Sequence, residues 1–456
     1  MRTFFEPRSA ALIGASSRPG RPGRHLFLNM RDGLGDRLYP VNPSADEIDG
    51  TRCYHSLAEV PETPDLAVVF IPAAAVPEAL EQCAAKGIRR VIIESAGFAE
   101  TGPEGAQLQR RCLDIARAAN MRLWGPNCMG MINVRRDLVL SFMLPEIWKD
   151  RFVKGGVALV VQSGMLSAGF LMQILSKSPF GLSKVCSVGN KMDVDEVDIL
   201  EYLVDDPETE VIAMYLESLP RGRRFVELAA ATKKPVVALK AGRSAQGAAA
   251  AASHTASLAQ DDAVLDGAFR QAGIIRVDGM YQLMDVARCL SMGPLRPAES
   301  ARVAVITFSG GAGVVTSDDL AAHGLRVAEL LPATIDRLRA VYPEWMTPMN
   351  PVDLYPAIEK SGPAAFAVAI DATLKDPGVD AVFLHLFAPP NRSLNFDYDG
   401  FSGLIKSGGK PFLVWALGYG PSCIEMSREL EKRGIPTTDE IEKGARILAA
   451  MTKTRG

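Results

Sequence analysis

Short runs of apolar residues recur along the whole chain, and segments long enough for a helix separate them. Many runs are rich in β-branched residues and end in Gly, Ser or Pro. Examples are SAALIGA, DLAVVFIP, RRVIIES, GVALVVQSG, VIAMYLES, PVVALKAG, RVAVITFSGG, AVFLHLF and PFLVWALG. Continuous apolar runs of this length are typical of parallel strands that helices bury on both faces. The pattern predicts an α/β protein built from doubly wound parallel sheets.

Two polar interruptions divide this pattern. The segment WKDRFVKGG begins at Trp148 and precedes a fresh apolar run, and GPLRPAES spans residues 293–300. The chain has 456 residues, and domains average about 100–200 residues. We therefore predict three domains, at 1–147, 148–294 and 295–456.

The second and third predicted domains look like copies of one another. GVALVVQSGMLSAGFL resembles RVAVITFSGGAGVVTSDDL, DDPETEVIAMYLE resembles KDPGVDAVFLHLF, and KKPVVALKAGRS resembles GKPFLVWALGYG, in the same order. A duplicated doubly wound sheet accounts for this order. The copies differ in two places. Glu217 in the first corresponds to Phe387 in the second, and His254, in the segment SHTAS of the first copy, has no counterpart in the second. Any chemistry is therefore expected in the first copy.

Composition narrows the class of protein. Net charge is −3, which gives no basic field for nucleic acid or anionic membranes. The seven cysteines are dispersed without C-x-x-C pairs, a pattern typical of reduced thiols in the cytoplasm. No signal peptide and no apolar stretch of membrane-spanning length are recognised. We expect a cytoplasmic protein.

The first domain contains a glycine-rich turn between a strand and a helix, AALIGASSRPGRPGRHLFLNM. Gly14 and Gly20 permit close approach by a ligand, and the following helix start favours phosphate. The spacing is not G-x-G-x-x-G, because Ser16 replaces the second glycine. The next strand ends in Asn42, where a nicotinamide-binding protein would carry an acid, which counts against an oxidoreductase. A plain tight turn with solvated arginines is the alternative.

His254 stands apart among the five histidines. It follows a run of small residues and is flanked by Ser253 and Thr255. A neutral imidazole is a competent nucleophile toward phosphorus when an acceptor holds its other nitrogen, and Glu217 is a candidate acceptor. Ser163 and Gly164 open a helix whose amides suit an anion. A loop with an incidental histidine is the alternative reading.

These residues carry a resemblance to a known family. Along essentially the whole chain the sequence resembles the α subunit of the NDP-forming acyl-CoA synthetases, relatives of succinyl-CoA synthetase. The matching motifs are GASSRPGRPG, YPVNP, GPNCMG, QSG, GNKMDVDEVD, YLES, KAGRS, SHTAS, SGGAG and NPVDL. The resemblance implies a CoA-binding Rossmann-like domain followed by two flavodoxin-like ligase domains.

The resemblance also implies a role for each matching residue. His254 would carry the phosphoryl group and Glu217 would position it, with phosphate bound by Ser163, Gly164, Ser253 and Thr255. CoA contacts would come from Gly14, Ser16, Gly20, Pro40, Asn42, Pro72 and Asn127. The implied reaction joins a small carboxylic acid to CoA through an acyl phosphate and converts a nucleoside triphosphate into the diphosphate and phosphate. No metal ligands are expected within this chain.

One departure from the family is important. No segment reads as an ATP-grasp domain, so we expect a separate ATP-grasp β subunit to bind ATP or GTP with Mg²⁺, in an α₂β₂-type assembly. A non-catalytic, CoA-responsive regulatory protein on the same fold is the alternative. The sequence does not identify the acid, and the shape of the pocket near Ser163, Met165 and the partner surface is expected to decide it.

Overall fold

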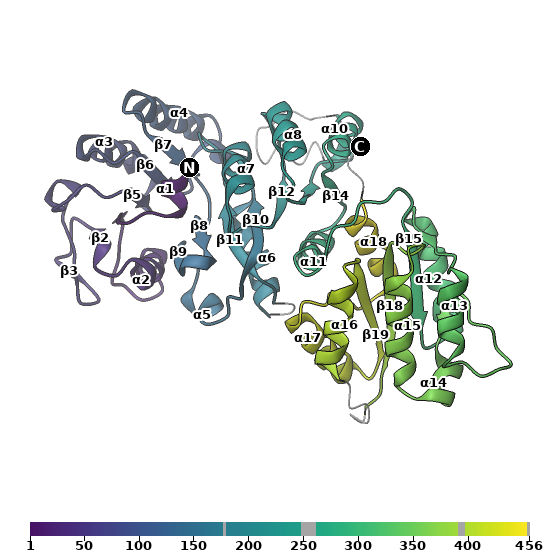
Figure 1. The fold of residues 1–456 in the computed structure, drawn as a ribbon. Coiled ribbons are helices and arrows are strands. Elements are labelled where there is room, and N and C mark those ends of the chain that lie inside the picture. The colour runs from purple at the N-terminus through teal and green to yellow at the C-terminus, as the bar shows by residue number, and fades with distance from the viewer. Residues whose placement is uncertain (177–178, 248–260, 391–396, 454–456) are drawn as a thin grey trace. The chain divides into compact units, whose positions relative to one another are not determined.

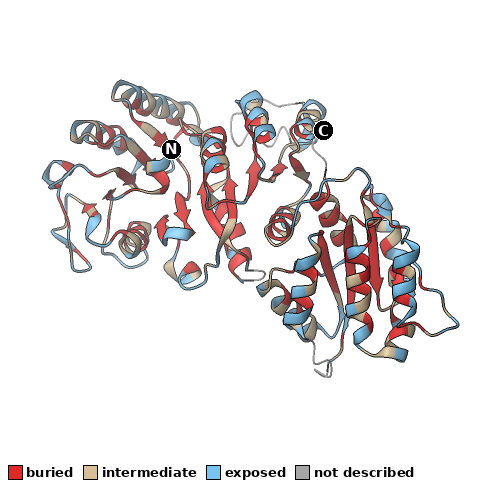
Figure 2. Cartoon of the chain, viewed as in Figure 1, coloured by how far each residue is buried: buried red, intermediate tan, exposed pale blue. Residues whose placement is uncertain are grey.

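The computed structural model describes residues 1–176, 179–247, 261–390 and 397–453. They form two compact units, Met1–Met284 and Asp285–Gly456. Both consist of parallel sheets flanked by helices (Figure 1), so the predicted α/β class is confirmed. Buried residues concentrate on the strands and on the helix faces turned toward them (Figure 2). Within the described ranges, no helix combines the length and apolar character that crossing a bilayer would require.

The first sheet has five parallel strands in the order β2-β1-β5-β6-β7. Its strands are β1 (Ala10–Ile13), β2 (Leu38–Val41), β5 (Leu66–Val69), β6 (Arg90–Ile93) and β7 (Arg122–Trp124); its helices are α1 (Arg2–Phe5), α2 (Pro22–Leu34), α3 (Val76–Lys86) and α4 (Pro103–Ala118). A small hairpin of β3 (Glu47–Ile48) and β4 (Thr51–Arg52) lies beside it. The order reverses between β1 and β5. Ligands of such sheets bind at that switch point, at the carboxyl ends of the strands.

The second sheet has seven strands in the order β14-β13-β12-β10-β11-β8-β9. The parallel strands are β10 (Lys154–Val161), β11 (Leu182–Ser187), β12 (Val211–Leu216), β13 (Val236–Lys240) and β14 (Ile275–Val277), with helices α5 (Pro145–Trp148), α6 (Gly164–Ser176), α7 (Glu196–Asp205), α8 (Gly222–Ala231), α10 (Asp262–Gln271) and α11 (Met280–Leu290). Its switch point lies between β10 and β12, which are neighbours.

Two antiparallel strands extend this second sheet. They are β8 (Met131–Asn133) and β9 (Leu138–Leu140), and β8 pairs with β11. Both precede residue 148, where the sequence predicted the second domain to begin. The boundaries 1–147, 148–294 and 295–456 stay a prediction.

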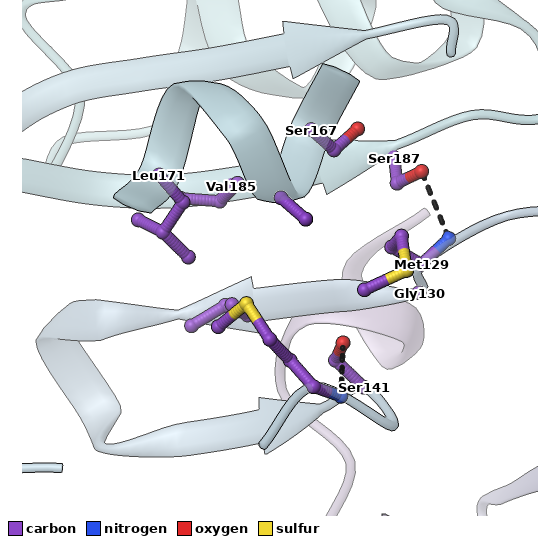
Figure 3. A pocket seen from close by; sticks show the side chains of 10 residues that line it. Met129, Gly130, Ser141, Ser167, Leu171, Val185 and Ser187 are labelled. Carbon is purple, nitrogen blue, oxygen red and sulfur yellow. Dashed lines mark hydrogen bonds between the residues drawn. The ribbon is translucent and has the colours of Figure 1, made fainter. Parts of the chain in front are cut away.

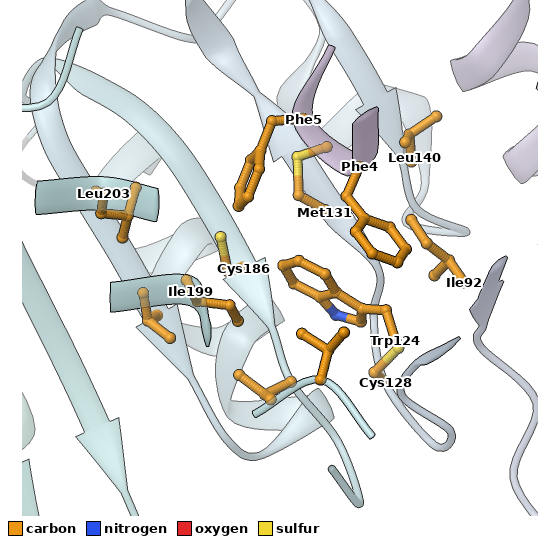
Figure 4. Close-up of a cluster of buried hydrophobic side chains, with 14 of the residues drawn as sticks. Phe4, Phe5, Ile92, Trp124, Cys128, Met131, Leu140, Cys186, Ile199 and Leu203 are labelled. Carbon is orange, nitrogen blue, oxygen red and sulfur yellow. The ribbon is translucent and has the colours of Figure 1, made fainter. Parts of the chain in front are cut away.

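One continuous core joins the first two sheets. The Trp124 ring lies 5.6 Å from that of Phe4 and 5.7 Å from that of Phe5, and Phe5 stacks on Tyr202 of α7 at 4.1 Å. Trp124 Nε1 also donates to the Ser187 carbonyl at the end of β11, at 2.7 Å. Figure 4 shows Phe4, Phe5 and Trp124 packed with Met131 and Cys186. This shared core connects the two sheets that carry the predicted ligand sites.

The second unit contains a sheet in the order β16-β15-β18-β19-β20, with β17 paired to β15. Its strands are β15 (Arg302–Thr307), β16 (Arg326–Val327), β17 (Val352–Asp353), β18 (Ala381–Ala388), β19 (Phe412–Gly418) and β20 (Thr437–Thr438), and its helices are α12 (Gly310–Ala322), α13 (Pro332–Arg339), α14 (Tyr355–Ser361), α15 (Ala364–Lys375), α16 (Tyr398–Gly408), α17 (Gly420–Lys432) and α18 (Ile441–Met451). Matched strand by strand, this order equals that of β11-β10-β12-β13-β14 in the second sheet, as the sequence duplication predicts.

Candidate active site

The predicted phosphate turn lies at the switch point of the second sheet. Ser163 lies just after β10, separated from Val161 at the strand end by Gln162, and α6 begins at Gly164. The Ser163 carbonyl accepts hydrogen bonds from the Ser167 amide at 3.0 Å and the Ser167 hydroxyl at 2.8 Å. The first amides of a helix have no partner within the helix and carry partial positive charge, so this turn suits an anion.

Glu217 lies at the same switch point, directly after β12. Only 8% of its surface is exposed. Its amide donates to Gln162 Oε1 at 2.8 Å, and the Ser218 amide donates to the same oxygen at 3.1 Å. Gln162 immediately precedes Ser163, so a single side chain fixes the carboxylate-bearing strand end to the phosphate turn.

The carboxylate of Glu217 is itself oriented by Tyr215. The Tyr215 hydroxyl donates to Glu217 Oε1 at 3.3 Å. Burial, with the adjacent carboxylate, raises the pKa of Tyr215 to about 12. The phenol therefore stays protonated at neutral pH and remains a donor to Glu217.

Two lysines reach this edge that sequence reasoning did not select. Lys191 Nζ donates to Ser218 Oγ at 2.8 Å and to the Ser218 carbonyl at 3.0 Å, and it pairs with Glu196 at 2.9 Å. Lys240 ends β13, and burial lowers its pKa while the carboxylates of Asp262 and Glu217 oppose that effect. Both follow apolar runs in motifs already noted, GNKMDVDEVD and KAGRS. The available signal was the position of Lys240 at the end of β13 and of Lys191 in the turn that follows β11.

The Lys191–Glu196 pair is almost completely buried, with side-chain exposures of 7% and 1%. Burial raises the pKa of Glu196, and the Lys191 ammonium counters that shift. Breaking such a pair leaves a buried charge without its partner, which costs about 3–5 kcal/mol. The pair anchors the Ser218 backbone, and with it the strand end that carries Glu217.

Four of the predicted CoA contacts meet at the switch point of the first sheet. Gly14 follows β1 with φ +98°, and a Cβ there would lie 2.1 Å from the Phe70 carbonyl, so only glycine fits. Asn42, after β2, donates to the Ala15 carbonyl at 2.8 Å. Ser16 accepts from the Arg18 amide at 3.2 Å, and Pro72 follows β5.

The other three predicted contacts lie apart from that cluster. Gly20 is exposed in the loop before α2, with φ +73°. Pro40 is buried within β2, opposite Leu12 of β1. Asn127 follows β7 at the far edge of the sheet. The CoA-binding role of all seven residues stays a prediction.

Asn127 instead faces the second sheet. Its side-chain amide donates to Asn190 Oδ1 at 3.3 Å, and a Cβ on Gly164 would lie 3.6 Å from the Asn127 carbonyl. Asn190 precedes Lys191. The loop after β7 therefore touches both the phosphate turn and the segment that anchors Glu217.

Glu94 is a further buried carboxyl group at this junction. It follows β6, is 2% exposed, and accepts from the Phe142 amide at 3.2 Å. Its Oε1 has no hydrogen-bond partner among the described residues, and burial raises its pKa well above the ordinary value. The apolar run RRVIIES predicted this strand end, but Glu94 itself was not assigned a role.

His254, Ser253 and Thr255 lie outside the described residues, in the segment 248–260. Their proximity to Glu217 and Ser163 is therefore still a prediction.

Three family models match consecutive parts of the chain. A CoA binding domain matches residues 8–134, a succinyl-CoA ligase like flavodoxin domain matches 154–290, and a ligase-CoA domain matches 303–390. The matches follow the order of the three sheets.

Similar proteins include chains of two lengths. Acetate–CoA ligase (ADP-forming) II subunit alpha of Pyrococcus furiosus is 37% identical over 99% of this chain and 97% of its own length. Acetate–CoA ligase (ADP-forming) II and I of Archaeoglobus fulgidus are 36% and 35% identical, and the chain spans 67% and 63% of their lengths. The match to the alpha subunit is thus almost end to end.

A solved structure is similar over nearly the whole chain. It is the dinucleotide forming acetyl-coenzyme A synthetase 1 of Ca. Korarchaeum cryptofilum in complex with phosphate and ADP. The TM-score is 0.87 at 30% identity, covering 99% of this chain and 96% of that one.

Proposed function

The chain belongs to the family of ADP-forming acyl-CoA synthetases, and from this membership we propose that it is the CoA-binding, phosphohistidine-bearing subunit of an acid–CoA ligase. The overall reaction converts a carboxylate, CoA and a nucleoside triphosphate into acyl-CoA, the nucleoside diphosphate and phosphate. His254 carries the phosphoryl group between a nucleotide site on a partner and the site where the acid is activated.

The observation that carries the proposal is the arrangement at the second switch point. A buried carboxylate at 217 and the amino end of α6 at 163–164 share one strand edge, fixed to each other by Gln162. A carboxylate beside an imidazole holds its tautomer and stabilises the positive charge that develops as it attacks phosphorus. Helix amides at the same edge hold the phosphoryl oxygens.

The proposed reaction has three steps. The imidazole of His254 attacks the γ-phosphorus and releases the nucleoside diphosphate. The acid's carboxylate oxygen then attacks phospho-His254, which frees the imidazole and forms the acyl phosphate. The CoA thiolate attacks the acyl carbon and expels phosphate. Catalysis of this kind depends on positioning and charge stabilisation, which the buried Lys191, Lys240 and helix amides are placed to supply.

CoA is assigned to the first sheet. Gly14, Ser16, Asn42 and Pro72 lie at its switch point, and the loop carrying Asn127 reaches the phosphate turn. A cofactor whose nucleotide end occupies the first edge would extend its thiol toward the second along this loop. Gly20 and Pro40 complete the proposed contact set.

A separate ATP-grasp β subunit is proposed to bind ATP or GTP with Mg²⁺. Relatives that this chain matches almost end to end are named alpha subunits, which supports a partner subunit, and we propose an α₂β₂-type assembly in the cytoplasm. Ser253 and Thr255, which flank His254, are proposed to hold the phosphoryl group together with Ser163 and Gly164.

The test uses the chain with and without an ATP-grasp partner from the same genome. We expect the chain alone to bind CoA by calorimetry and to release no ADP. With the partner, one equivalent of ADP should be released as His254 is phosphorylated, and continued turnover with further ADP release should require both CoA and an acid. Binding of NADH in place of CoA, or ADP release unaffected by His254→Ala, would contradict the proposal. CoA binding that persists with no ligase activity under any condition would favour the regulatory alternative.

A further inference from the structure

A partly open pocket lies beside the amino-terminal part of α6, close to the phosphate turn. It is bounded by the first two turns of α6, by β11, and by the loop and hairpin that begin after Cys128 (Figure 3). Its lining residues are Met129, Gly130, Ile132, Ser141, Met143, Ser167, Ala168, Leu171, Val185 and Ser187, all of them buried. None of the reaction steps derived above uses this pocket.

The pocket adjoins the place where the acid's carboxylate must react. A Cβ on Gly164 would lie 3.7 Å from Met129 Cγ, and Met129 lines the pocket. Ser167, one turn along α6, bonds the Ser163 carbonyl and also lines it. A carboxylate held at the amino end of α6 therefore has its hydrocarbon part directed at this pocket or outward to solvent.

The chemistry of the lining is that of a hydrocarbon site. Among the residues that the structure describes, no Lys, Arg, His, Asp or Glu lines it. The three hydroxyls are occupied by backbone groups: Ser167 donates to the Ser163 carbonyl at 2.8 Å, Ser187 accepts from the Met129 amide at 2.9 Å, and Ser141 accepts from the Met143 amide at 3.3 Å. A second carboxylate buried here would lose its hydration without gaining a cation, which is strongly unfavourable.

The size of the pocket adds a limit on chain length. The enclosed space holds about one water molecule, which is close to the volume of one methyl group. Leu171 closes the end along α6, and Met129 and Met143 flank it. Methionine is adaptable, whereas buried leucine is close-packed and yields less. Leu171 is therefore the firmer limit.

We propose that this pocket receives the hydrocarbon tail of the acid and that Leu171 and Met129 set the accepted chain length. The inference rests on the proposed function, since it assigns the acyl end of that same reaction. It selects short, unbranched monocarboxylic acids and excludes dicarboxylates. Met165, which sequence reasoning placed near the acid, is 77% exposed and does not line the pocket.

The experiment follows a half-reaction that the chain performs alone. Acyl-CoA and labelled phosphate give acyl phosphate and CoA, and the acyl phosphate transfers its phosphoryl group to His254 and releases the acid. Initial rates of protein labelling are measured with acetyl-, propionyl-, butyryl-, hexanoyl- and succinyl-CoA. Wild-type protein should label fastest with the two- and three-carbon groups and fall about tenfold for each added methylene beyond them. Succinyl-CoA should give no label.

Substitutions in the pocket lining should change the accepted chain length. Leu171→Ala and Met129→Ala should raise the labelling rate with butyryl- and hexanoyl-CoA at least tenfold relative to that with acetyl-CoA. Ala168→Leu, which fills the pocket, should lower the labelling rate with propionyl-CoA relative to that with acetyl-CoA. Met165→Ala is the matched control and should leave the profile unchanged. CoA affinity, measured separately, should not change in any variant.

The outcomes separate the two claims. Labelling of the wild type with an acyl profile that none of the pocket variants shifts would overturn the pocket assignment and leave the proposed function standing. Absence of labelling with every acyl-CoA would remove the proposed function and the pocket assignment together. Should Leu171→Ala fail to fold, the Ala168→Leu and Met129→Ala profiles decide the question, because they alter opposite walls.

Discussion

The second and third sheets share one topology and differ at one edge. In both, a lysine just before a strand, β13 in the second sheet and β19 in the third, donates to the carbonyl of an aspartate: Lys234 to Asp206 at 2.6 Å, and Lys410 to Asp376 at 2.6 Å. The two aspartates follow the ends of α7 and α15, the helices that precede β12 and β18. They have been kept in both copies, which indicates that they serve the fold.

Apart from the Ser-Gly turn that both copies keep, at Ser163-Gly164 and Ser309-Gly310, the carboxyl edges have diverged. Gln162, Glu217 and Lys240 of the second sheet correspond to Phe308, Phe387 and Ala416 of the third. The Phe308 and Phe387 rings lie 5.6 Å apart, and Phe387 is 50% exposed. One edge is thus buried, charged and hydrogen-bonded, and the other is aromatic. The contacts shared by both copies therefore serve the fold, and the proposed chemistry belongs to the carboxyl edge of the second sheet, where the copies differ.

The largest effect is expected at Glu217. Glu217→Gln keeps the size of the side chain and removes its charge, so the developing imidazolium loses its partner. We expect kcat for acyl-CoA formation with an ATP-grasp partner to fall about 100- to 1,000-fold. Phe387→Gln, at the matching place in the third sheet, should change kcat by less than about twofold. Equal losses at both positions would erase the distinction between the edges.

Lys191→Met should lower kcat about 100-fold, because the strand end that carries Glu217 loses its anchor. It should also destabilise the fold, since Glu196 is left buried without its cation. The double variant Lys191→Met/Glu196→Gln separates the two effects: melting temperature should recover while kcat stays low. Recovery of kcat in the double variant would show that Lys191 acts only through stability. Lys191→Arg should restore part of kcat.

Exchanging residues between the copies gives a smaller effect. Gln162→Phe copies Phe308 and removes the acceptor of two backbone amides, which costs about 1–3 kcal/mol for each group left unsatisfied. We expect kcat to fall about tenfold with little change in the affinity for CoA. The reverse exchange, Phe308→Gln, should leave kcat unchanged. A loss of kcat from Phe308→Gln as large as that from Gln162→Phe would contradict this account.

The smallest effect is a difference in pH dependence. Tyr215 of β12 corresponds to His385 of β18. Burial lowers the pKa of His385 to about 3, below the value of about 6.5 for an exposed histidine. The unfolded chain therefore binds a proton that the native unit does not, and native stability falls as pH decreases below about 6.5, by about 1.4 kcal/mol for each pH unit. Tyr215 does not titrate in that range.

Denaturant unfolding between pH 4 and pH 7 measures this slope. His385→Gln should flatten the pH dependence, because glutamine does not titrate. Tyr215→Phe, the matched change in the other copy, should leave the slope as it is. A slope unaffected by His385→Gln would place the acid sensitivity elsewhere.

The strand ends that form the candidate site could be predicted from the sequence, but several of the residues that gather there could not. Each of the nine apolar runs forms a parallel strand, and Ser163 and Glu217, which follow two of them, lie at one sheet edge linked through Gln162. Lys191 and Lys240 were missed because their convergence depends on strand order, which the runs do not encode. The hairpin β8–β9 was missed because its strands have three residues each, too few to show a period. Phe4 and Phe5 gave no sign that they fill the joint between two sheets.

The most direct test of the account asks where a phosphoryl group attaches. The chain is incubated with acetyl-CoA and labelled phosphate, and the label is mapped by mass spectrometry under alkaline conditions. We expect an acid-labile, base-stable label on His254, absent from His254→Ala and strongly reduced in Glu217→Gln but not in Phe387→Gln. Label on another residue, or label that survives His254→Ala, would contradict it.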